Sequence, residues 1–230
     1  MFGEGKPAGI RTIISGSMTP VLQTGDRVAV FTLARPPKRG DVLIFHHPLF
    51  KDAIPLGKRV VGLPGDTVKL EAGRLIVNGV MVERTLLREV TYYERGWKRG
   101  VHVLEYSEQL PGEDTPHIIH EVADDARYDD TPEFKVPDGH LFMIGDNRDY
   151  SYDSRDPSGH MPFRGKREPG RKYTSVDLPE KQTKPAIGFV PVEMIIGRVR
   201  TVVQSVASCE KAKAEAEGAE CIVPSINKRL

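Results

Sequence analysis

Short apolar runs separated by Gly and Pro constrain the fold of this chain more than any other feature of its sequence. The runs are rich in Val, Ile and Phe, and they are Arg27–Leu33, Val42–His46, Arg59–Val61, Val101–Tyr106, Leu141–Ile144 and Gly197–Val203. Runs this short, bounded by turn residues such as those of Gly62–Asp66, are typical of β-strands rather than helices. The sequence therefore predicts a mainly β fold.

One pair of runs also predicts how its strands are joined. Leu75–Val77 and Val80–Val82 flank the dipeptide Asn78-Gly79. Asn-Gly tolerates the positive φ angles of a type I′ turn, which joins two antiparallel strands. The sequence predicts an antiparallel hairpin here, and it predicts a helix only near Glu210–Glu217.

Two shifts in composition divide the chain. Residues 83–138 are polar and acidic, which predicts a smaller, hairpin-rich lobe inserted into the core. Residues 156–185 are rich in Pro, Gly, Lys and Arg without periodicity, which predicts a long exposed loop. We therefore expect a catalytic core built from residues 1–82 and 139–230, interrupted by the lobe 83–138.

Net charge and hydropathy exclude some classes of protein. A formal net charge of +1 gives no electrostatic reason to expect nucleic-acid binding. No window approaches the roughly 18 consecutive apolar residues of a spanning helix. Cys209 and Cys221 would stand roughly 18 Å apart along an unbroken helix, so a disulfide requires the chain to turn back between them. A bridge and two free thiols both stay open.

The segment Ser15-Gly16-Ser17 could supply a nucleophile. A serine hydroxyl attacks a carbonyl only if a base takes its proton and donors stabilise the oxyanion. One serine could attack while its own N–H and the hydroxyl of the other serine face the developing charge. The same tripeptide also occurs in ordinary turns, so by itself it does not establish an active site.

Lys58 could supply the base. A lysine accepts a proton only when it is neutral, and burial disfavours its charged form. Lys58 opens an apolar strand with Val60 on the same face, a position in which the side chain can be buried. Pairs of Ser and Lys are a known nucleophile–base arrangement. A lysine at the edge of a sheet whose charged head reaches water is the alternative.

The segment Gly145–Arg155 directly follows an apolar run and alternates acids with arginines. Such a pattern predicts a hydrogen-bonded network that orients a site, or a structural ion-pair turn. A calcium loop starting at Asp149 fails, because Ser154 stands where a turn Gly belongs and His160 where a bidentate Glu belongs. The histidines have no metal-ligand spacing, so we expect no metal and no cofactor.

Together and in this order, these segments resemble the type I signal peptidases, the family that removes signal peptides from exported proteins. The segments that carry the resemblance are Ser15–Asp26 for the nucleophile box, Arg39–Phe45 for the strand box, Lys58–Asp66 for the lysine box, Gly145–Arg155 for the Gly-Asp-Asn-Arg box, and Gly188–Glu193 with Ile196–Arg198 for the closing segment. They span most of the chain. The family fold is a mostly antiparallel β structure with a second lobe between the lysine and Gly-Asp-Asn-Arg boxes.

The resemblance implies a role for particular residues. Ser17 would be the nucleophile, Lys58 the general base, and Ser15 an oxyanion donor beside the Ser17 N–H. Ser151 would hydrogen-bond to Lys58 and position it. The residues expected to hold the surrounding network are Asp146, Arg148, Asp153 and Arg155. The residues expected to line shallow pockets for small side chains, of the Ala-x-Ala type, are Met18 and Leu22.

The chain departs from the family pattern at two positions near these residues. Ile14 stands where the family usually has Pro, and Gly57 where it usually has a bulky apolar residue. Family members carry membrane helices shortly before the nucleophile, so we expect this chain to begin after such an anchor. The implied partners are signal peptides and the membrane surface, and the implied location is the outer face of the bacterial inner membrane.

Two other functions are compatible with parts of this pattern. A self-cleaving repressor-type Ser/Lys protease also has a Ser-Met segment followed by Gly-Asp, but it normally carries a DNA-binding helix-turn-helix, which nothing here resembles. A catalytically silent binding module on the same fold is the second alternative. The retained Ser17, Lys58 and Ser151 favour an enzyme.

Overall fold

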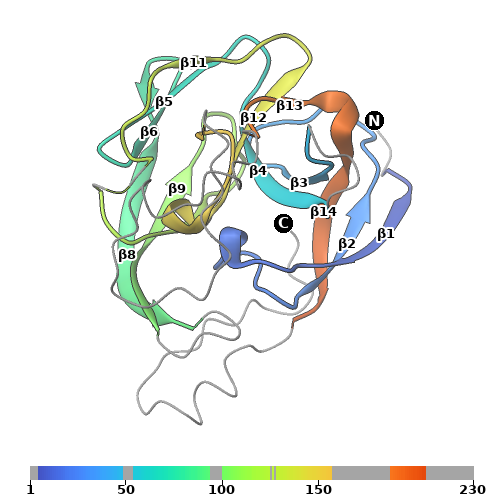
Figure 1. The fold of residues 1–230 in the computed structure, drawn as a ribbon, viewed down its shortest axis with the longest axis horizontal. Coiled ribbons are helices and arrows are strands. Elements are labelled where there is room, and N and C mark those ends of the chain that lie inside the picture. The colour runs from blue at the N-terminus through green and yellow to red at the C-terminus, as the bar shows by residue number, and fades with distance from the viewer. Residues whose placement is uncertain are drawn as a thin grey trace, which may run out of the picture.

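A computed structural model describes residues 5–48, 54–93, 100–124, 126, 128–156 and 187–205. These residues form three antiparallel sheets and short 3₁₀ turns (Figure 1). The mainly β fold expected from the sequence is confirmed, and each of the apolar runs overlaps a strand. The expected helix near Glu210–Glu217, Cys209, Cys221 and nearly all of the loop 156–185 lie outside the described residues. Among the described residues, no helix is long and apolar enough to cross a bilayer.

The largest sheet has seven strands and contains the strand that carries Lys58. In spatial order its strands are β1 (Pro7–Thr12), β2 (Arg27–Phe31), β14 (Ile195–Gln204), β3 (Val42–Phe45), β4 (Leu56–Gly62), β12 (His140–Ile144) and β13 (Val190–Pro191). Strand β4 lies between β3 and β12, with Lys58 opposite Leu43. This inner position explains why β4 is buried along most of its length.

Both faces of β4 are covered, because successive side chains of a strand point to opposite faces. Val60 belongs to a buried cluster that includes Leu43 and Met143. The next residue, Val61, belongs to a different cluster that includes Val68 and Phe142. Lys58 and Arg59 stand two residues before these valines and therefore point to opposite sides of the sheet.

A second sheet has the order β11-β5-β6-β7. Its strands are β5 (Thr67–Glu71), β6 (Arg74–Val77), β7 (Val80–Met81) and β11 (Phe134–Lys135). Asn78 and Gly79 join β6 to β7 with φ angles of 52° and 75°. The predicted hairpin is therefore confirmed, with both turn residues in the left-handed region that a type I′ turn requires.

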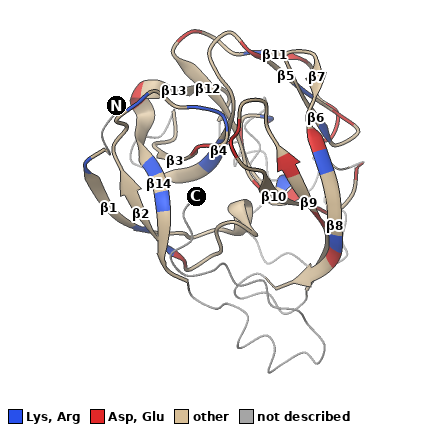
Figure 2. Ribbon diagram, turned by 180° about the vertical axis from the view of Figure 1, so that it is seen from behind, with Lys and Arg blue, Asp and Glu red and all other residues tan. Residues whose placement is uncertain are grey.

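A third sheet, of order β10-β9-β8, comes from the acidic part of the chain. Its strands are β8 (Glu83–Tyr92), β9 (Val101–Gln109) and β10 (His117–Glu121). In Figure 2, where the ribbon is coloured by residue type, basic and acidic positions are both present along β8. The division of the chain into residues 1–82, 83–138 and 139–230 stays a prediction, since the second sheet already draws on residues 67–81.

Two short turns carry the residues of greatest chemical interest. The 3₁₀ turn η1 (Gly16–Met18) contains Ser17, and the 3₁₀ turn η2 (Arg148–Tyr150) lies in the segment Gly145–Arg155. The main-chain N–H of Asn147 donates to the carbonyl of Ser17 at 3.1 Å, which brings the two turns together. In Figure 1, η1 is the short blue coil between the seven-stranded sheet and the sheet of β8 and β9.

Candidate active site

The nucleophile candidate, Ser17, sits in a turn that leaves its amide unpaired. Its side chain is nearly buried, and Ser15 before it is exposed and extended, with φ −146° and ψ 152°. The Ser15 and Ser17 hydroxyl oxygens are 3.4 Å apart. Within the described part of the chain, the Ser17 N–H donates no hydrogen bond. A free N–H and a neighbouring hydroxyl are the donors that an oxyanion needs.

Lys58 meets Ser17 directly. The Lys58 ammonium donates to the Ser17 hydroxyl oxygen at 2.5 Å, and only 3% of Lys58 is exposed. Burial lowers the pKa of Lys58 to about 8. The negative charges of Asp153 and Asp146 act to raise this pKa, and the positive charge of Arg155 acts to lower it. No carboxylate in the described residues forms a salt bridge with Lys58. A lysine with this pKa is partly neutral near neutral pH and can accept a proton.

Gly145 allows the segment Gly145–Arg155 to press against the nucleophile. A Cβ atom at Gly145 would lie 2.2 Å from the Ser151 Oγ and 2.4 Å from the Ser17 carbonyl oxygen, so no side chain fits there. The Ser151 hydroxyl is buried and has no hydrogen-bond partner among the described residues, so the contact predicted with Lys58 is not formed in this structure.

Asp153 and Arg155 form a fully buried ion pair at this end of the segment. Arg155 donates to both carboxylate oxygens of Asp153 at 2.9 Å and to the Arg148 carbonyl at 2.6 Å. Asp153 also accepts from the Gly145 N–H at 3.1 Å. Burial alone would raise the pKa of the Asp153 carboxyl, but Arg155 outweighs it and the pKa is lowered. The pair therefore stays charged and holds Gly145 in place.

Asp146 faces the other side of β4 and holds Arg59. The Arg59 guanidinium donates to both Asp146 oxygens, at 2.7 and 2.8 Å, and to the Gly40 carbonyl at 2.7 Å. Burial opposes the charged form of Arg59, but Asp146 outweighs it and the pKa is raised. Bidentate pairing of this kind fixes the relative position of β4 and the segment after β12.

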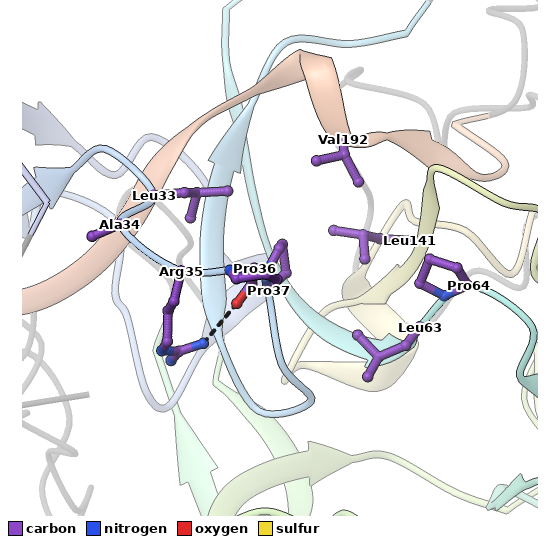
Figure 3. A pocket seen from close by; sticks show the side chains of 9 residues that line it. All are labelled: Leu33, Ala34, Arg35, Pro36, Pro37, Leu63, Pro64, Leu141 and Val192. Carbon is purple, nitrogen blue, oxygen red and sulfur yellow. Dashed lines mark hydrogen bonds between the residues drawn. The ribbon is translucent and has the colours of Figure 1, made fainter. Parts of the chain in front are cut away.

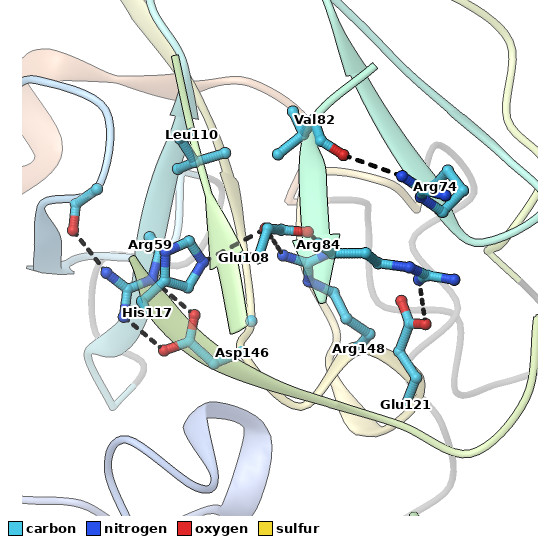
Figure 4. A network of polar contacts seen from close by, with 12 residues as sticks. Arg59, Arg74, Val82, Arg84, Glu108, Leu110, His117, Glu121, Asp146 and Arg148 are labelled. Atoms are coloured by element: carbon cyan, nitrogen blue, oxygen red, sulfur yellow. Dashed lines mark hydrogen bonds and ion pairs between the residues drawn. The ribbon is translucent and has the colours of Figure 1, made fainter. Parts of the chain in front are cut away.

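The ionic contacts continue from Asp146 into the third sheet, as Figure 4 shows. Arg148 makes a two-point ion pair with Glu108 of β9. His117 of β10 lies between two carboxylates, 3.3 Å from Glu108 and 2.9 Å from Glu113. Burial and Arg59 oppose protonation of His117, but these carboxylates outweigh them and its pKa is raised. The third sheet is therefore fastened to the segment Gly145–Arg155 by buried charges.

Met18 and Leu22 lie in the core rather than on an open surface. They are 2% and 0% exposed and pack in one cluster with Val28, Val30 and Ile44. Side chains with so little exposed surface can support the floor of a peptide-binding site, but they can make few direct contacts with a bound peptide. Their substrate-lining role stays a prediction.

An apolar pocket of about 510 Å³ lies apart from these residues (Figure 3). It is lined by Leu33, Ala34, Arg35, Pro36, Pro37, Leu63, Pro64, Leu141 and Val192. The lining contains neither Ser17 nor Lys58 and holds one charged side chain, Arg35, which bonds to the Pro36 carbonyl. We assign this pocket no chemistry.

Several residues around the site were not predicted from the sequence. Four of them lie outside every motif: Tyr92, Glu108, Glu113 and His117. Two more, Arg59 and Asn147, lie within motifs, but the sequence assigned them no role. The motifs themselves were the available signal for Arg59 and Asn147. Nothing local marks the others: a lone tyrosine such as Tyr92 has no motif around it, and charged residues in a polar stretch are usually solvated.

Comparisons with known proteins identify the family of this chain. The family model described as "Signal peptidase, peptidase S26" matches residues 7–204. A signal peptidase I of Pseudomonas aeruginosa is 38% identical over 159 residues, which cover 62% of this chain and 53% of that protein. A signal peptidase I of Rickettsia massiliae is 38% identical over 135 residues, covering 56% and 48%.

A solved structure, a signal peptidase I from Enterococcus faecalis, is similar at 20% identity with a TM-score of 0.34, covering 71% of this chain and 97% of that one. The chain spans about half the length of the curated relatives that it matches. Because the family model covers most of its length, the chain belongs to the signal peptidase family, peptidase S26.

Proposed function

We propose that this chain is a serine endopeptidase that removes signal peptides from exported preproteins, with Ser17 as nucleophile and Lys58 as general base. The observation that carries the proposal is the 2.5 Å contact between the Lys58 Nζ and the Ser17 Oγ, made by a buried lysine. Family membership supports the same reaction. A snorkelling surface lysine would instead keep its charged head in water.

The reaction would proceed through an acyl-enzyme. Neutral Lys58 takes the hydroxyl proton of Ser17 while the Oγ attacks the scissile carbonyl carbon. The Ser17 N–H and the Ser15 hydroxyl donate to the oxyanion that forms. The Lys58 ammonium returns the proton to the leaving amine, and the peptide bond breaks. A water molecule, deprotonated in the same way, then hydrolyses the ester and frees Ser17.

The substrate would bind as an added β-strand. Ile14 and Ser15 make no main-chain hydrogen bond within the described residues, and Ser15 is extended. An extended segment with free main-chain groups can pair with a peptide of varied sequence, while pockets select side chains. We propose small residues of the Ala-x-Ala type before the cut, with Met18 and Leu22 under them.

A place at the outer face of the bacterial inner membrane fits this substrate. Signal peptides emerge there, and the relatives of this chain are longer than the segment it matches. Ile10 and Ile14, which precede Ser17 in the chain, leave 49% and 46% of their surface exposed. Apolar side chains in such positions suit a membrane surface or an apolar peptide as partner.

Cleavage of a preprotein with an Ala-x-Ala site tests the proposal. We expect Ser17→Ala to abolish cleavage and labelling by an active-site acylating probe. Ser107→Ala, which changes a partly buried serine of β9, serves as the matched control and should keep both. Cleavage retained by Ser17→Ala, or no cleavage and no labelling by the unmodified chain, would overturn the proposal, the second in favour of a silent binding module.

A further inference from the structure

Asn147 holds the nucleophile turn η1, which carries Ser17, at two points, and it is itself held by Tyr92. Its side-chain Nδ2 donates to the Gly16 carbonyl at 2.9 Å and to the Tyr92 hydroxyl at 2.8 Å. Its main-chain N–H donates to the Ser17 carbonyl at 3.1 Å. Asn147 is 1% exposed, so water does not compete for these bonds. No other side chain of the described residues binds the main chain of η1 in this way.

The contact with Gly16 acts on the peptide unit that ends in the Ser17 N–H. A trans peptide is planar, so its C=O and N–H point in opposite directions and turn together. The Gly16–Ser17 peptide is trans, and the Thr19 N–H also donates to the Gly16 carbonyl, at 3.1 Å. Two donors on one end of this unit therefore fix the direction of the free N–H at its other end.

The orientation of the Asn147 amide follows from its partners. The Gly16 carbonyl can only accept a hydrogen bond, so the amide nitrogen must face it. The other hydrogen on that nitrogen is then donated to the Tyr92 hydroxyl oxygen. Tyr92 ends β8, is 5% exposed, and its ring lies 5.4 Å from that of His120. Through this phenol hydroxyl the third sheet contacts the residue that holds the nucleophile turn.

We propose that Asn147 is a positioning residue for the oxyanion hole, which aims the Ser17 N–H by fixing the Gly16 carbonyl, and that Tyr92 keeps the Asn147 amide in place. This rests on the proposed function, in which the Ser17 N–H is an oxyanion donor. Removing a direct donor costs about 10²–10³ in kcat, so removing the residue that aims it should cost less.

Kinetics of Asn147→Ala provide the first test. We expect kcat to fall about 10- to 100-fold with KM within about twofold, because the aim of the N–H matters in the transition state alone. The midpoint of the acid limb of the pH profile should not move, because Lys58 is untouched. A peptide boronic acid, whose serine adduct is tetrahedral and anionic, should bind about 10- to 100-fold more weakly.

Tyr92→Phe provides the second test and avoids a cavity. It removes only the oxygen that accepts from Asn147, and we expect kcat to fall about three- to tenfold with the same unchanged KM and pH midpoint. Tyr106→Phe removes a phenol oxygen from the neighbouring strand β9, where the ring packs under Arg84, and should leave kcat unchanged. If Asn147→Ala fails to fold, Tyr92→Phe still decides the question.

The outcomes separate this inference from the proposed function. If Ser17→Ala retains cleavage, the proposed function fails, and this inference fails with it. If cleavage depends on Ser17 but kcat and boronate affinity of Tyr92→Phe equal those of Tyr106→Phe, the positioning role is wrong. A shifted pH midpoint in either Asn147→Ala or Tyr92→Phe would also overturn it, since that result assigns the effect to Lys58.

Discussion

Lys58 and Arg59 are neighbours on one strand and have opposite surroundings. The side of β4 that carries Lys58 meets the hydroxyl of Ser17, with no carboxylate in salt-bridge range among the described residues. The side that carries Arg59 meets both oxygens of Asp146 and the Gly40 carbonyl. Burial is nearly the same, at 3% and 5% exposed.

Burial therefore does not decide which cation can give up its proton; the partners of each side chain do, together with the higher ordinary pKa of arginine. Burial opposes the charge on both residues, and it prevails at Lys58, whose pKa is lowered to about 8. At Arg59 the charge of Asp146 outweighs it, and the pKa is raised. One side of the strand offers the candidate base, and the other offers a fixed charge that holds β4 against the segment after β12.

The largest effect on activity should come from Lys58→Met. Methionine fills a similar volume but cannot accept a proton, so we expect the cleavage rate of an Ala-x-Ala preprotein to fall at least about 10³-fold. Lys58→Arg should be equally inactive, because arginine keeps its proton. Activity within about tenfold of the unmodified chain in either variant would remove Lys58 from the mechanism.

Lys58→Met should also stabilise the fold. At pH 7, burying the charged lysine costs about 3 kcal/mol, given a pKa that falls from 10.5 to about 8 at about 1.4 kcal/mol per pH unit. The unfolded chain holds the Lys58 proton up to pH 10.5, so the cost is full below pH 8 and disappears by pH 10.5. Urea unfolding of Lys58→Met should show this gain at pH 7 and none near pH 10.5.

The matching change on the other side, Arg59→Met, should act in the opposite direction. It leaves the Asp146 carboxylate buried without its partner, and breaking a buried pair in this way costs about 3–5 kcal/mol. The double variant Arg59→Met/Asp146→Asn should recover part of the loss, because the amide carries no charge. Urea unfolding measures both, and an Arg59→Met chain as stable as the unmodified one would contradict the contrast between the two sides.

The pH profile of cleavage should show the Lys58 titration and nothing from Arg59. With a folded pKa of about 8, kcat/KM should fall about tenfold for each pH unit below 8, or about 100-fold at pH 6 relative to its plateau. Circular dichroism at the same pH values checks that the chain stays folded. A profile that is flat between pH 8 and 6 would show that a neutral lysine is not required.

The sequence predicts the sheet framework around these two residues but not all of its strands. Runs such as Val42–His46 and Leu141–Ile144 lie on inner strands, where both faces are buried and the residues are continuously apolar. Strand β8 was missed because it is exposed along most of its length and carries charges of both signs. It pairs with β9 through main-chain hydrogen bonds, which do not depend on side-chain hydropathy and so cannot be predicted from it.

The candidate site also has a part that the sequence predicts and a part that it does not. Ser17, Lys58 and the segment Gly145–Arg155 could be predicted as site residues because each stands in a motif, and these motifs follow a recognisable order along the chain. The contact between Tyr92 and Asn147 joins residues 55 positions apart, and it exists only because the third sheet packs against that segment. Contacts that depend on packing between sheets carry no local signal, so the sequence could not predict them.

The smallest effect should come from Gly57→Ala, directly before Lys58 on β4. A Cβ there would lie 3.1 Å from the terminal methyl of Ile44, which can rotate away, so we expect less than about 1 kcal/mol of destabilisation and cleavage within about threefold. Ile44→Val removes that methyl, so the added cost of Gly57→Ala should vanish in the double variant, as a thermodynamic cycle measured by urea unfolding would show. If cleavage instead falls much more than stability, and Ile44→Val does not restore it, Gly57 shapes the surroundings of Lys58 itself. The difference between the two sides of β4 would then depend on the backbone of this strand as well as on the partners of its two cations.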